Sequence, residues 1–209
     1  VEKVVRQGME LVPEGELVVC TVLFSDIRGF TKLSKGMPPR DVVGLLNEYF
    51  EQMVEVVFSY GGTLDKFMGD GLMAVWGTPV QSSTDAFFAA KAADQMRQVL
   101  DNVVNKDRLA RGEEPLFAGF GIATGHVVAG GIGGARRQDF TVIGDPVNLA
   151  SRLCNQAVAG QVLVCEETQK ACLEDGVNFK ALPAITIKGI EYPVKVFDMP
   201  TTVSVSGGD

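Results

Sequence analysis

The chain has few of the residues that most zinc sites and nucleophilic hydrolases require, since its 209 residues include one histidine, His126. Its four cysteines form no CxxC pair and stand at Cys20, Cys154, Cys165 and Cys172. We therefore expect no zinc site or disulfide framework, but four reduced and mostly packed thiols. A Ser-His-Asp or Cys-His mechanism would depend on His126 alone. We expect that histidine to be a tolerated turn residue, with a dimer-interface or regulatory contact as the alternatives.

Long apolar runs and an excess of positive charge are also lacking. The longest near-continuous apolar run, Leu17–Phe24, is too short to span a bilayer, and no charged-then-apolar signal segment opens the chain. We therefore expect a cytoplasmic protein, or a cytoplasmic piece of a larger one, with no membrane segment. The net charge of −7 argues against nucleic-acid binding, which requires a basic surface. An anionic nucleotide needs only local positive charge and is not excluded.

Length and composition predict one sizeable domain. A chain of 209 residues with 46% hydrophobic residues can bury a substantial core. Residues 1–16 are weakly patterned and read as a linker or the tail of an upstream segment. Residues 199–209 are small and polar, typical of a flexible tail. The domain is therefore expected over residues 17–198.

Strand and helix patterns alternate along this domain. The first strand covers residues 17–25, and an amphipathic helix covers residues 38–60. The hairpin 63–68 and 71–76 follows, and then a second long helix that Ser83 or Thr84 can cap. Further strands are predicted at 116–123, 127–129, 140–143, 162–165, 184–188 and 193–198. A helix is predicted to start at Asp145-Pro146, and a short helix is predicted at 167–173. This order predicts an α+β fold with a ferredoxin-like βαββαβ core and additional C-terminal strands and helix.

Two aspartates are expected to meet where neighbouring strands of this sheet end. Asp26 follows the first strand in FSDIRGFT, and Asp70 lies in the Gly-Asp-Gly turn of the hairpin. Each has a plain structural alternative, because Asp26 can cap a helical turn and Asp70 can serve the turn itself. Antiparallel pairing of the strands brings the two carboxylates together. Paired carboxylates suit Mg²⁺, with nucleotide phosphates completing its coordination. The main-chain N–H groups of Gly29, Phe30 and Thr31 can face the same anion.

Four more positions can contact a nucleotide. Lys66 donates only, whereas Thr141 donates and accepts, a combination that suits the N1 acceptor and N6 donor of adenine. Asn148 and Arg152 lie one helical turn apart in DPVNLASRL and suit ribose positioning and stabilisation of phosphoryl charge. A solvated strand face and a polar helix face are the alternatives.

The segment 130–139 is glycine-rich and carries adjacent arginines at 136 and 137. Such a loop can close over triphosphate oxygens, although a solvated hairpin loop explains the pattern nearly as well. It does not fit the Walker pattern GxxxxGK[ST].

The segments FSDIRGFT, FMGDGLMAVWG, GIATGHVVAGGIG and TVIGDPVNLASRL resemble, in order and spacing, the catalytic domain of class III adenylyl/guanylyl cyclases. The resemblance covers roughly residues 17–198. It implies a dimer whose active sites lie at the interface, each binding two Mg²⁺ or Mn²⁺ ions. The metal ligands it implies are Asp26, Asp70 and the Ile27 carbonyl.

The resemblance also implies how a nucleotide is held. Phe30 and Thr31 offer main-chain N–H groups to the terminal phosphates, Arg136 matches a phosphate-binding arginine, and Lys188 is a weaker match to a phosphate-contacting lysine. The partner subunit would supply Lys66 and Thr141 for the base, Asn148 for the ribose and Arg152 for the transition state. The set is complete on one chain, which predicts a homodimer with two shared sites.

The base-binding pair favours ATP as the substrate. Many adenylyl cyclases carry aspartate where Thr141 stands, and guanylyl cyclases typically carry glutamate where Lys66 stands. The Lys/Thr pair resembles a bacterial adenylyl subgroup that often responds to bicarbonate. The sequence is silent on upstream regulation and leaves both a bicarbonate response and an upstream sensor domain open. The alternatives are a guanylyl cyclase and a catalytically silent nucleotide-binding dimerisation module. A diguanylate cyclase would carry a GG[DE]EF turn, where this chain has FMGDG.

Overall fold

The computed structural model describes residues 15–134, 137–186 and 193–200. Within these ranges the chain forms one sheet of eight strands in the order β2-β3-β1-β4-β6-β8-β7, with β5 paired to β4. The strands are β1 (Glu16–Ile27), β2 (Thr63–Met68), β3 (Gly71–Trp76), β4 (Ala118–Gly134), β5 (Arg137–Ile143), β6 (Val162–Cys165), β7 (Lys180–Ala181) and β8 (Val196–Asp198). The helices are α2 (Phe30–Leu33), α3 (Pro39–Ser59), α4 (Asp85–Val99), α5 (Asn105–Ala110), α6 (Asp145–Gln156) and α7 (Glu166–Ala171). A π-helical turn joins α4 to α5 at Leu100–Val104, and a 3₁₀ turn follows α7 at Leu173–Asp175.

The predicted ferredoxin-like core is confirmed. The elements β1, α3, β2, β3, α4 and β4 follow one another in the order βαββαβ, and their strands lie in the spatial order β2-β3-β1-β4. All three pairings among these four strands are antiparallel, whereas β6 joins β4 in parallel. The C-terminal elements therefore extend the sheet beyond β4, as expected for the additional strands.

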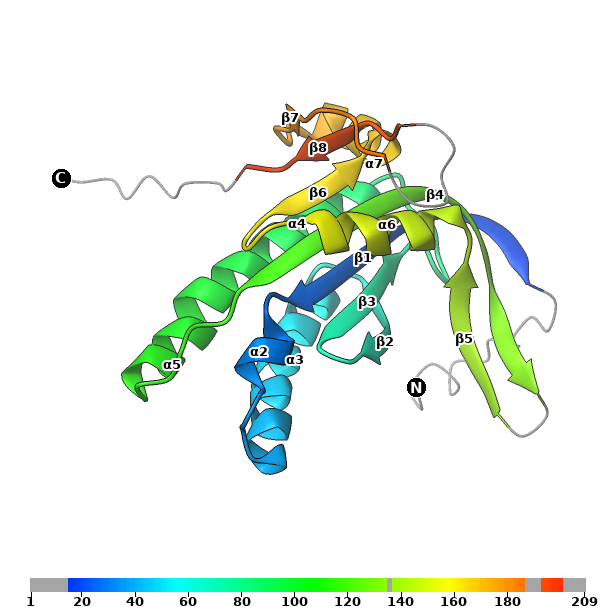
Figure 1. The fold of residues 1–209 in the computed structure, drawn as a ribbon. Coiled ribbons are helices and arrows are strands. Elements are labelled where there is room, and N and C mark those ends of the chain that lie inside the picture. Colours follow the sequence, from blue (N-terminus) through cyan, green and yellow to red (C-terminus); the bar gives the residue numbers. More distant parts are fainter. Residues whose placement is uncertain (1–14, 135–136, 187–192, 201–209) are drawn as a thin grey trace.

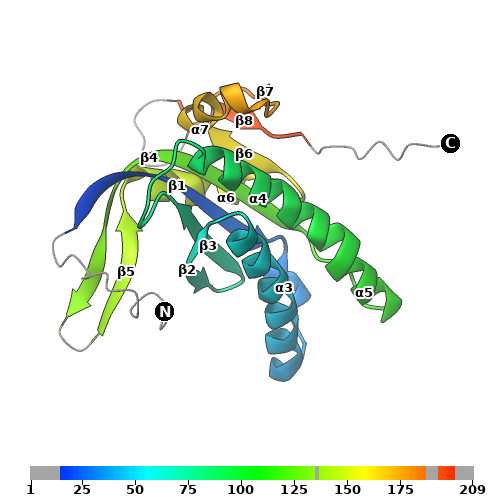
Figure 2. The same ribbon diagram turned by 180° about the vertical axis from the view of Figure 1, so that it is seen from behind.

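Helices cover both faces of the sheet (Figures 1 and 2). Helices α3 and α4 pack on one face, around Leu23, Tyr49 and Trp76. Helix α6 packs on the other, where Phe24 and Leu153 belong to a second apolar cluster. Because β1 is buried on both faces, its sequence is a continuous apolar run rather than an alternating one. None of the described helices is both long and apolar enough to cross a lipid bilayer.

The turn predicted at Thr124-Gly125-His126 is wrong, because β4 runs unbroken through these residues. A Cβ atom on Gly125 would lie 2.8 Å from Cγ of Pro146 at the start of α6. One on Gly121 would collide with the α6 backbone at Ala150 and Cys154. The glycines are therefore needed because a helix lies against the strand. His126 is an exposed strand residue opposite Val19.

The C-terminal strand predictions are only partly confirmed. The strand expected at 193–198 is limited to β8, and the one expected at 184–188 is reduced to an isolated bridge between Ile185 and Val194. Residues 187–192 lie outside the described residues.

The β4–β5 hairpin projects from the body of the molecule (Figure 1). The register of β1 with β4 ends at Ala129, whereas β5 pairs with β4 from Val128 to Gly134. The outer part of β4, from Gly130 to Gly134, is thus paired with β5 beyond the first residue of β1. Strand β5 carries Thr141 and leads directly into α6.

Candidate active site

The two predicted aspartates do lie together, at the end of β1 and the start of β3. Asp26 lies near the end of β1 and faces Gly71 in the register, directly after Asp70. Asp26 and Asp70 are therefore neighbours across the β1–β3 strand pair. Burial, followed by the neighbouring Asp70 carboxylate, raises the pKa of Asp26, and the Arg28 guanidinium partly offsets this. Two adjacent carboxylates are costly to ionise together unless a cation lies between them, so the pair fits a divalent metal ion.

The rest of a metal coordination shell would have to come from other oxygens. Among the described residues there is no group of three or more His, Cys, Asp and Glu side chains that could hold a metal. Main-chain carbonyls, water and substrate phosphates are the remaining ligands. Ile27 is 2% exposed and packs in the core, so its side chain is not available to the site.

A short segment with free main-chain N–H groups follows Asp26. Gly29 adopts a left-handed conformation with φ of 71°, and α2 starts at Phe30. The Gly29 carbonyl accepts hydrogen bonds from the N–H groups of Lys32 and Leu33. The N–H groups of Gly29, Phe30 and Thr31 have no main-chain acceptor among the described residues, as expected at the start of a helix. This arrangement agrees with the predicted anion-facing segment.

Arg28 is a site residue that the sequence reasoning missed. Its Nη1 atom lies 3.5 Å from Oδ2 of Asp26, while Nη2 donates to the Cys154 carbonyl of α6 at 2.5 Å. Its buried Nε has no partner among the described residues. Arg28 therefore ties the Asp26 carboxylate to the helix that carries Asn148 and Arg152. The available signal was spacing, because side chains two residues apart in extended chain point to the same side.

Lys66 and Thr141 are brought together although they lie 75 positions apart in the sequence. Both contact the same atom, Oδ2 of Asp65: the Thr141 hydroxyl donates to it at 2.8 Å, and Lys66 Nζ lies 3.3 Å away. The Asp65 side chain is 3% exposed, whereas that of Lys66 is 45% exposed. Asp65 was not singled out from the sequence, where it stood only as a neighbour of Lys66.

Asn148 and Arg152 lie on the same side of α6, as predicted. The opposite side of the helix packs on the sheet through Pro146, Ala150 and Leu153. Asn148 is exposed and Arg152 half-buried, and neither side chain makes a hydrogen bond or ion pair in the part of the chain that the structure describes. Both side chains are thus available to a ligand. Arg136 and Lys188 lie outside the described residues.

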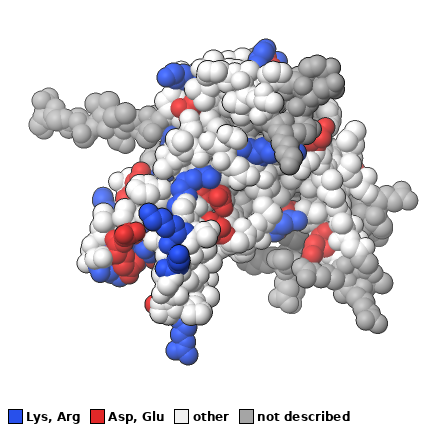
Figure 3. All heavy atoms as spheres, viewed as in Figure 1, with Lys and Arg blue, Asp and Glu red and all other residues white. Residues whose placement is uncertain are grey.

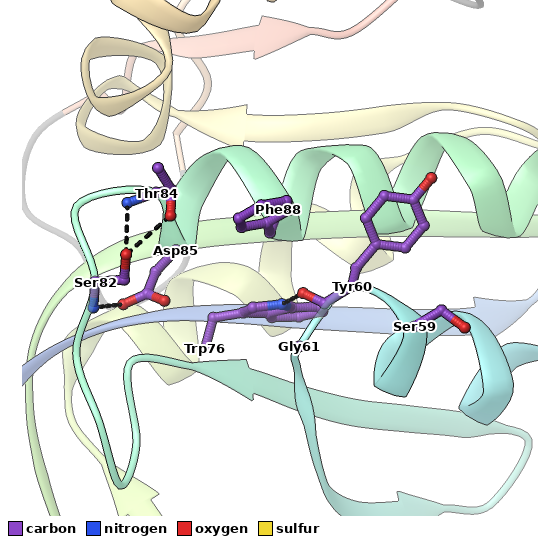
Figure 4. Close-up of a pocket in the computed structure, with 8 residues that line it drawn as sticks. All are labelled: Ser59, Tyr60, Gly61, Trp76, Ser82, Thr84, Asp85 and Phe88. Carbon is purple, nitrogen blue, oxygen red and sulfur yellow. Dashed lines mark hydrogen bonds between the residues drawn. The ribbon is translucent and has the colours of Figure 1, made fainter.

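The site is accessible to solvent, since the side chain of Asp26 is 33% exposed and that of Lys66 is 45% exposed. A shallow pocket lined by Trp76, Asp85 and Phe88 shares no residue with it (Figure 4). Trp76 and Gly71 are the two ends of β3, so this pocket lies at the end of the strand away from the aspartates. On the face that carries α6, acidic and basic side chains lie beside one another without a continuous basic area (Figure 3).

Comparisons with known proteins agree with this arrangement. The family model described as "Adenylate and Guanylate cyclase catalytic domain" matches residues 12–200. Adenylate cyclase 1 of Rhizobium meliloti is 34% identical over 181 residues, which are 86% of this chain and 27% of that protein. The chain spans between about a quarter and a third of the curated relatives it matches.

Two solved structures are similar in both fold and sequence. The adenylyl cyclase CyaB from P. aeruginosa has a TM-score of 0.86 and 36% identity, with 93% of this chain and 100% of that chain covered. The guanylyl cyclase Cya2 has a TM-score of 0.84 and 37% identity, with 88% and 93% covered. Since an adenylyl and a guanylyl cyclase are equally similar, overall similarity does not choose the nucleotide. By its sequence, fold and paired aspartates, the chain belongs to the adenylate and guanylate cyclase catalytic domain family.

Proposed function

We propose that this domain is an adenylyl cyclase, which converts ATP into 3′,5′-cyclic AMP and pyrophosphate. In this reaction the ribose 3′-oxygen attacks the α-phosphorus in line, loses its proton, and pyrophosphate leaves. The observation that carries the choice of ATP is the pairing of Lys66 with Thr141 on one buried carboxylate oxygen. Guanine would require an acceptor for its N1–H and 2-amino groups, and the ammonium of Lys66 only donates.

Asp26 and Asp70 would hold two Mg²⁺ or Mn²⁺ ions, with the Ile27 carbonyl as a further ligand. When bound, such ions lower the pKa of the 3′-hydroxyl and neutralise charge on the phosphates. The N–H groups of Phe30 and Thr31 would bind the terminal phosphates. Arg136 and Lys188 are proposed to contact phosphate as well.

Helix α6 would act on the reacting part of ATP. The Asn148 amide can hold the ribose by hydrogen bonds and so fix the position of the attacking oxygen. Arg152 can donate to phosphoryl oxygens, whose charge grows in the transition state. Both side chains reach outward from the sheet and have no partner within the described residues, so binding ATP breaks no existing contact of theirs.

We infer that the active form is a homodimer with two shared sites. In one protomer, no ion pair joins Arg152 to Asp26 or Asp70 among the described residues. An ATP molecule bound at the aspartates of one protomer would receive Lys66, Thr141, Asn148 and Arg152 from the other. This arrangement accounts for the solvent exposure of Asp26, Lys66 and Asn148 in a single chain.

The direct test is to incubate the purified chain with ATP and Mn²⁺ and to separate the products by chromatography. Cyclic AMP with an equal amount of pyrophosphate, abolished by EDTA, is the expected result. A higher kcat/KM with GTP would assign a guanylyl cyclase, and no product from a folded dimer would assign a silent nucleotide-binding module. Adding bicarbonate to the same assay tests the response that the Lys/Thr pair suggests.

A further inference from the structure

We propose that Asp65 is the residue that makes this site selective for adenine, by fixing which way the Thr141 hydroxyl points and where the Lys66 ammonium lies. This inference rests on the proposed function, because it concerns how the same site distinguishes ATP from GTP. Asp65 would not touch the nucleotide itself. It is a positioning residue that acts through the two side chains that do.

The backbone of β2 is built to present Asp65 and Lys66 together. Neighbouring residues in a regular strand point to opposite faces of the sheet. Here the register with β3 pairs Leu64 with Ala74 and Lys66 with Met73, so Asp65 is the extra residue of a β-bulge. A bulge re-aims side chains, and such irregularities are common beside active sites. As a result, adjacent residues on one strand both reach towards Thr141 of β5.

Asp65 interacts with both of the proposed base-binding side chains. Its side chain is 3% exposed, and its hydrogen-bond and ion-pair partners among the described residues are the Thr141 hydroxyl at 2.8 Å and Lys66 Nζ at 3.3 Å. Burying a carboxylate is unfavourable unless its charge and its lone pairs are compensated. An apolar residue at this bulge would avoid that cost, so the carboxylate is expected to serve the two groups it contacts.

The hydrogen bond from Thr141 has a direct consequence for base recognition. A free threonine hydroxyl rotates and can either donate or accept. Because its proton is given to Asp65, the Thr141 oxygen has only lone pairs left to offer a ligand. The 6-amino group of adenine can donate to those lone pairs, whereas the 6-oxo group of guanine would face them acceptor to acceptor.

Lys66 completes the same selection. One of its three N–H bonds can be directed to Asp65, and the others stay free because its side chain is 45% exposed. They can donate to N1 of adenine, which is an acceptor, but not to N1–H of guanine. Asp65 therefore makes the site present one donor and one acceptor in fixed places, the complement of the adenine edge.

The test compares the intact chain with Asp65→Asn, using ATP, GTP and inosine triphosphate as substrates. Inosine triphosphate carries the 6-oxo and N1–H groups of guanine without the 2-amino group. It therefore tests recognition at positions 6 and 1 of the purine alone. An asparagine amide can donate to the Thr141 oxygen and release the hydroxyl proton towards a 6-oxo group. We expect the ATP-to-inosine-triphosphate ratio of kcat/KM to fall at least about tenfold, the effect of one well-placed hydrogen bond. The charge-matched control Asp101→Asn, on an exposed residue outside the site, should leave the ratio unchanged.

Two further variants keep the inference testable if Asp65→Asn folds poorly. Thr141→Val removes the accepting oxygen and should lower the same ratio, while Thr141→Ser keeps the hydroxyl and should preserve it. In the Thr141→Val background, Asp65→Asn should have little additional effect, because both changes act through one hydrogen bond. A ratio that survives Thr141→Val, or Asp65→Asn in a folded protein, overturns the inference.

Failure of the proposed function gives a different result. An intact chain that prefers GTP, or forms no cyclic nucleotide, contradicts the proposed function whatever the variants do. Binding of 3′-deoxy-ATP and 3′-deoxy-GTP, which cannot cyclise, then measures base preference without turnover. An adenine preference that is lost in Asp65→Asn supports the role of Asp65 even in a silent domain, and equal binding of the two analogues by the intact chain overturns it.

Discussion

At the scale of single residues, the proposed role of Asp26 and Asp70 as metal ligands has a cost in stability. Burial and the Asp70 carboxylate raise the pKa of Asp26, so the folded chain without metal holds this proton to higher pH than the unfolded chain does. That contribution to stability is complete below the ordinary pKa of 3.8 and is lost as the pH rises through the raised value. In the metal-free protein, ionising Asp26 places its carboxylate beside that of Asp70, which costs stability.

Asp26→Asn is accordingly expected to raise the melting temperature of the metal-free protein at pH 7 and to abolish metal-dependent cyclisation. The pH dependence of the melting temperature between pH 4 and 7 should also become flatter. Calorimetry in EDTA, followed by the activity assay with Mn²⁺, checks both parts. A melting temperature that falls in the variant would show that the carboxylate is part of the structural turn instead.

Arg152→Ala is expected to lower kcat about 10²–10³-fold with little change in KM, because the guanidinium stabilises charge that develops only in the transition state. Steady-state kinetics with ATP measures this directly. The fold should be unaffected, since Arg152 has no partner within the described residues. Arg152→Lys keeps the charge but not the planar fork, so intermediate turnover is expected. Wild-type turnover in Arg152→Ala would contradict the assignment.

The residues found from sequence and those missed differ in a simple way. Asp26, Asp70, Asn148 and Arg152 stand at strand ends, turns and helix faces, positions that local patterns indicate. Asp65 and Arg28 matter because of contacts with residues far along the chain, Thr141 and Cys154. Local spacing carries no information about a partner 76 or 126 positions away.

At the scale of elements, the packing of α6 against β4 positions Asn148 and Arg152. Gly121 has no space for a Cβ, because the α6 backbone lies directly over it. Gly121→Ala is expected to push the helix outward, to lower the unfolding free energy by about 1–3 kcal/mol, and to lower kcat as well. Denaturant unfolding and kinetics on the same preparation check the two effects.

Gly44→Ala is the matched control for that change. Gly44 lies on the exposed side of α3 and has open space around its Cβ position. The same substitution there should stabilise the protein by about 0.5–1 kcal/mol and leave kcat unchanged. Equal activity in both variants would show that the α6–β4 distance does not matter for turnover.

The same contact explains why a turn was wrongly predicted. A glycine flanked by threonine and histidine is a common turn signal, and the sequence contains no mark of a helix that packs over the strand from 20 positions later. The buried strand β1 and the amphipathic helix α3 were predicted nearly to their ends, since periodicity reports burial on the element itself.

At the scale of the whole molecule, shared sites predict complementation between inactive variants. Asp70→Ala removes a proposed metal ligand from its chain. Arg152→Ala removes from its chain the group proposed to stabilise the transition state. In a mixed dimer, one site receives both defects and the other receives none. An equimolar mixture that exchanges freely is expected to recover about a quarter of the wild-type activity, because half the dimers are mixed and each has one intact site.

Kinetics after co-refolding the two variants measures the recovery, and each variant alone is the control. Activity per chain of the wild type should fall on dilution below the dimer dissociation constant. A mixture as inactive as its components, although mixed dimers are present, would show that each chain carries a whole site.

The unbroken path from β5 into α6 has a consequence for fidelity. Thr141 lies two residues before the end of β5, and Asn148 and Arg152 follow on α6, so one continuous segment carries the groups proposed to hold the base, the ribose and the reacting phosphate. A purine that sits badly against Thr141 shifts its own sugar and α-phosphorus relative to Arg152. A nucleotide whose base fits poorly should then slow the chemical step itself. Its kcat should be low even at a concentration that saturates the enzyme.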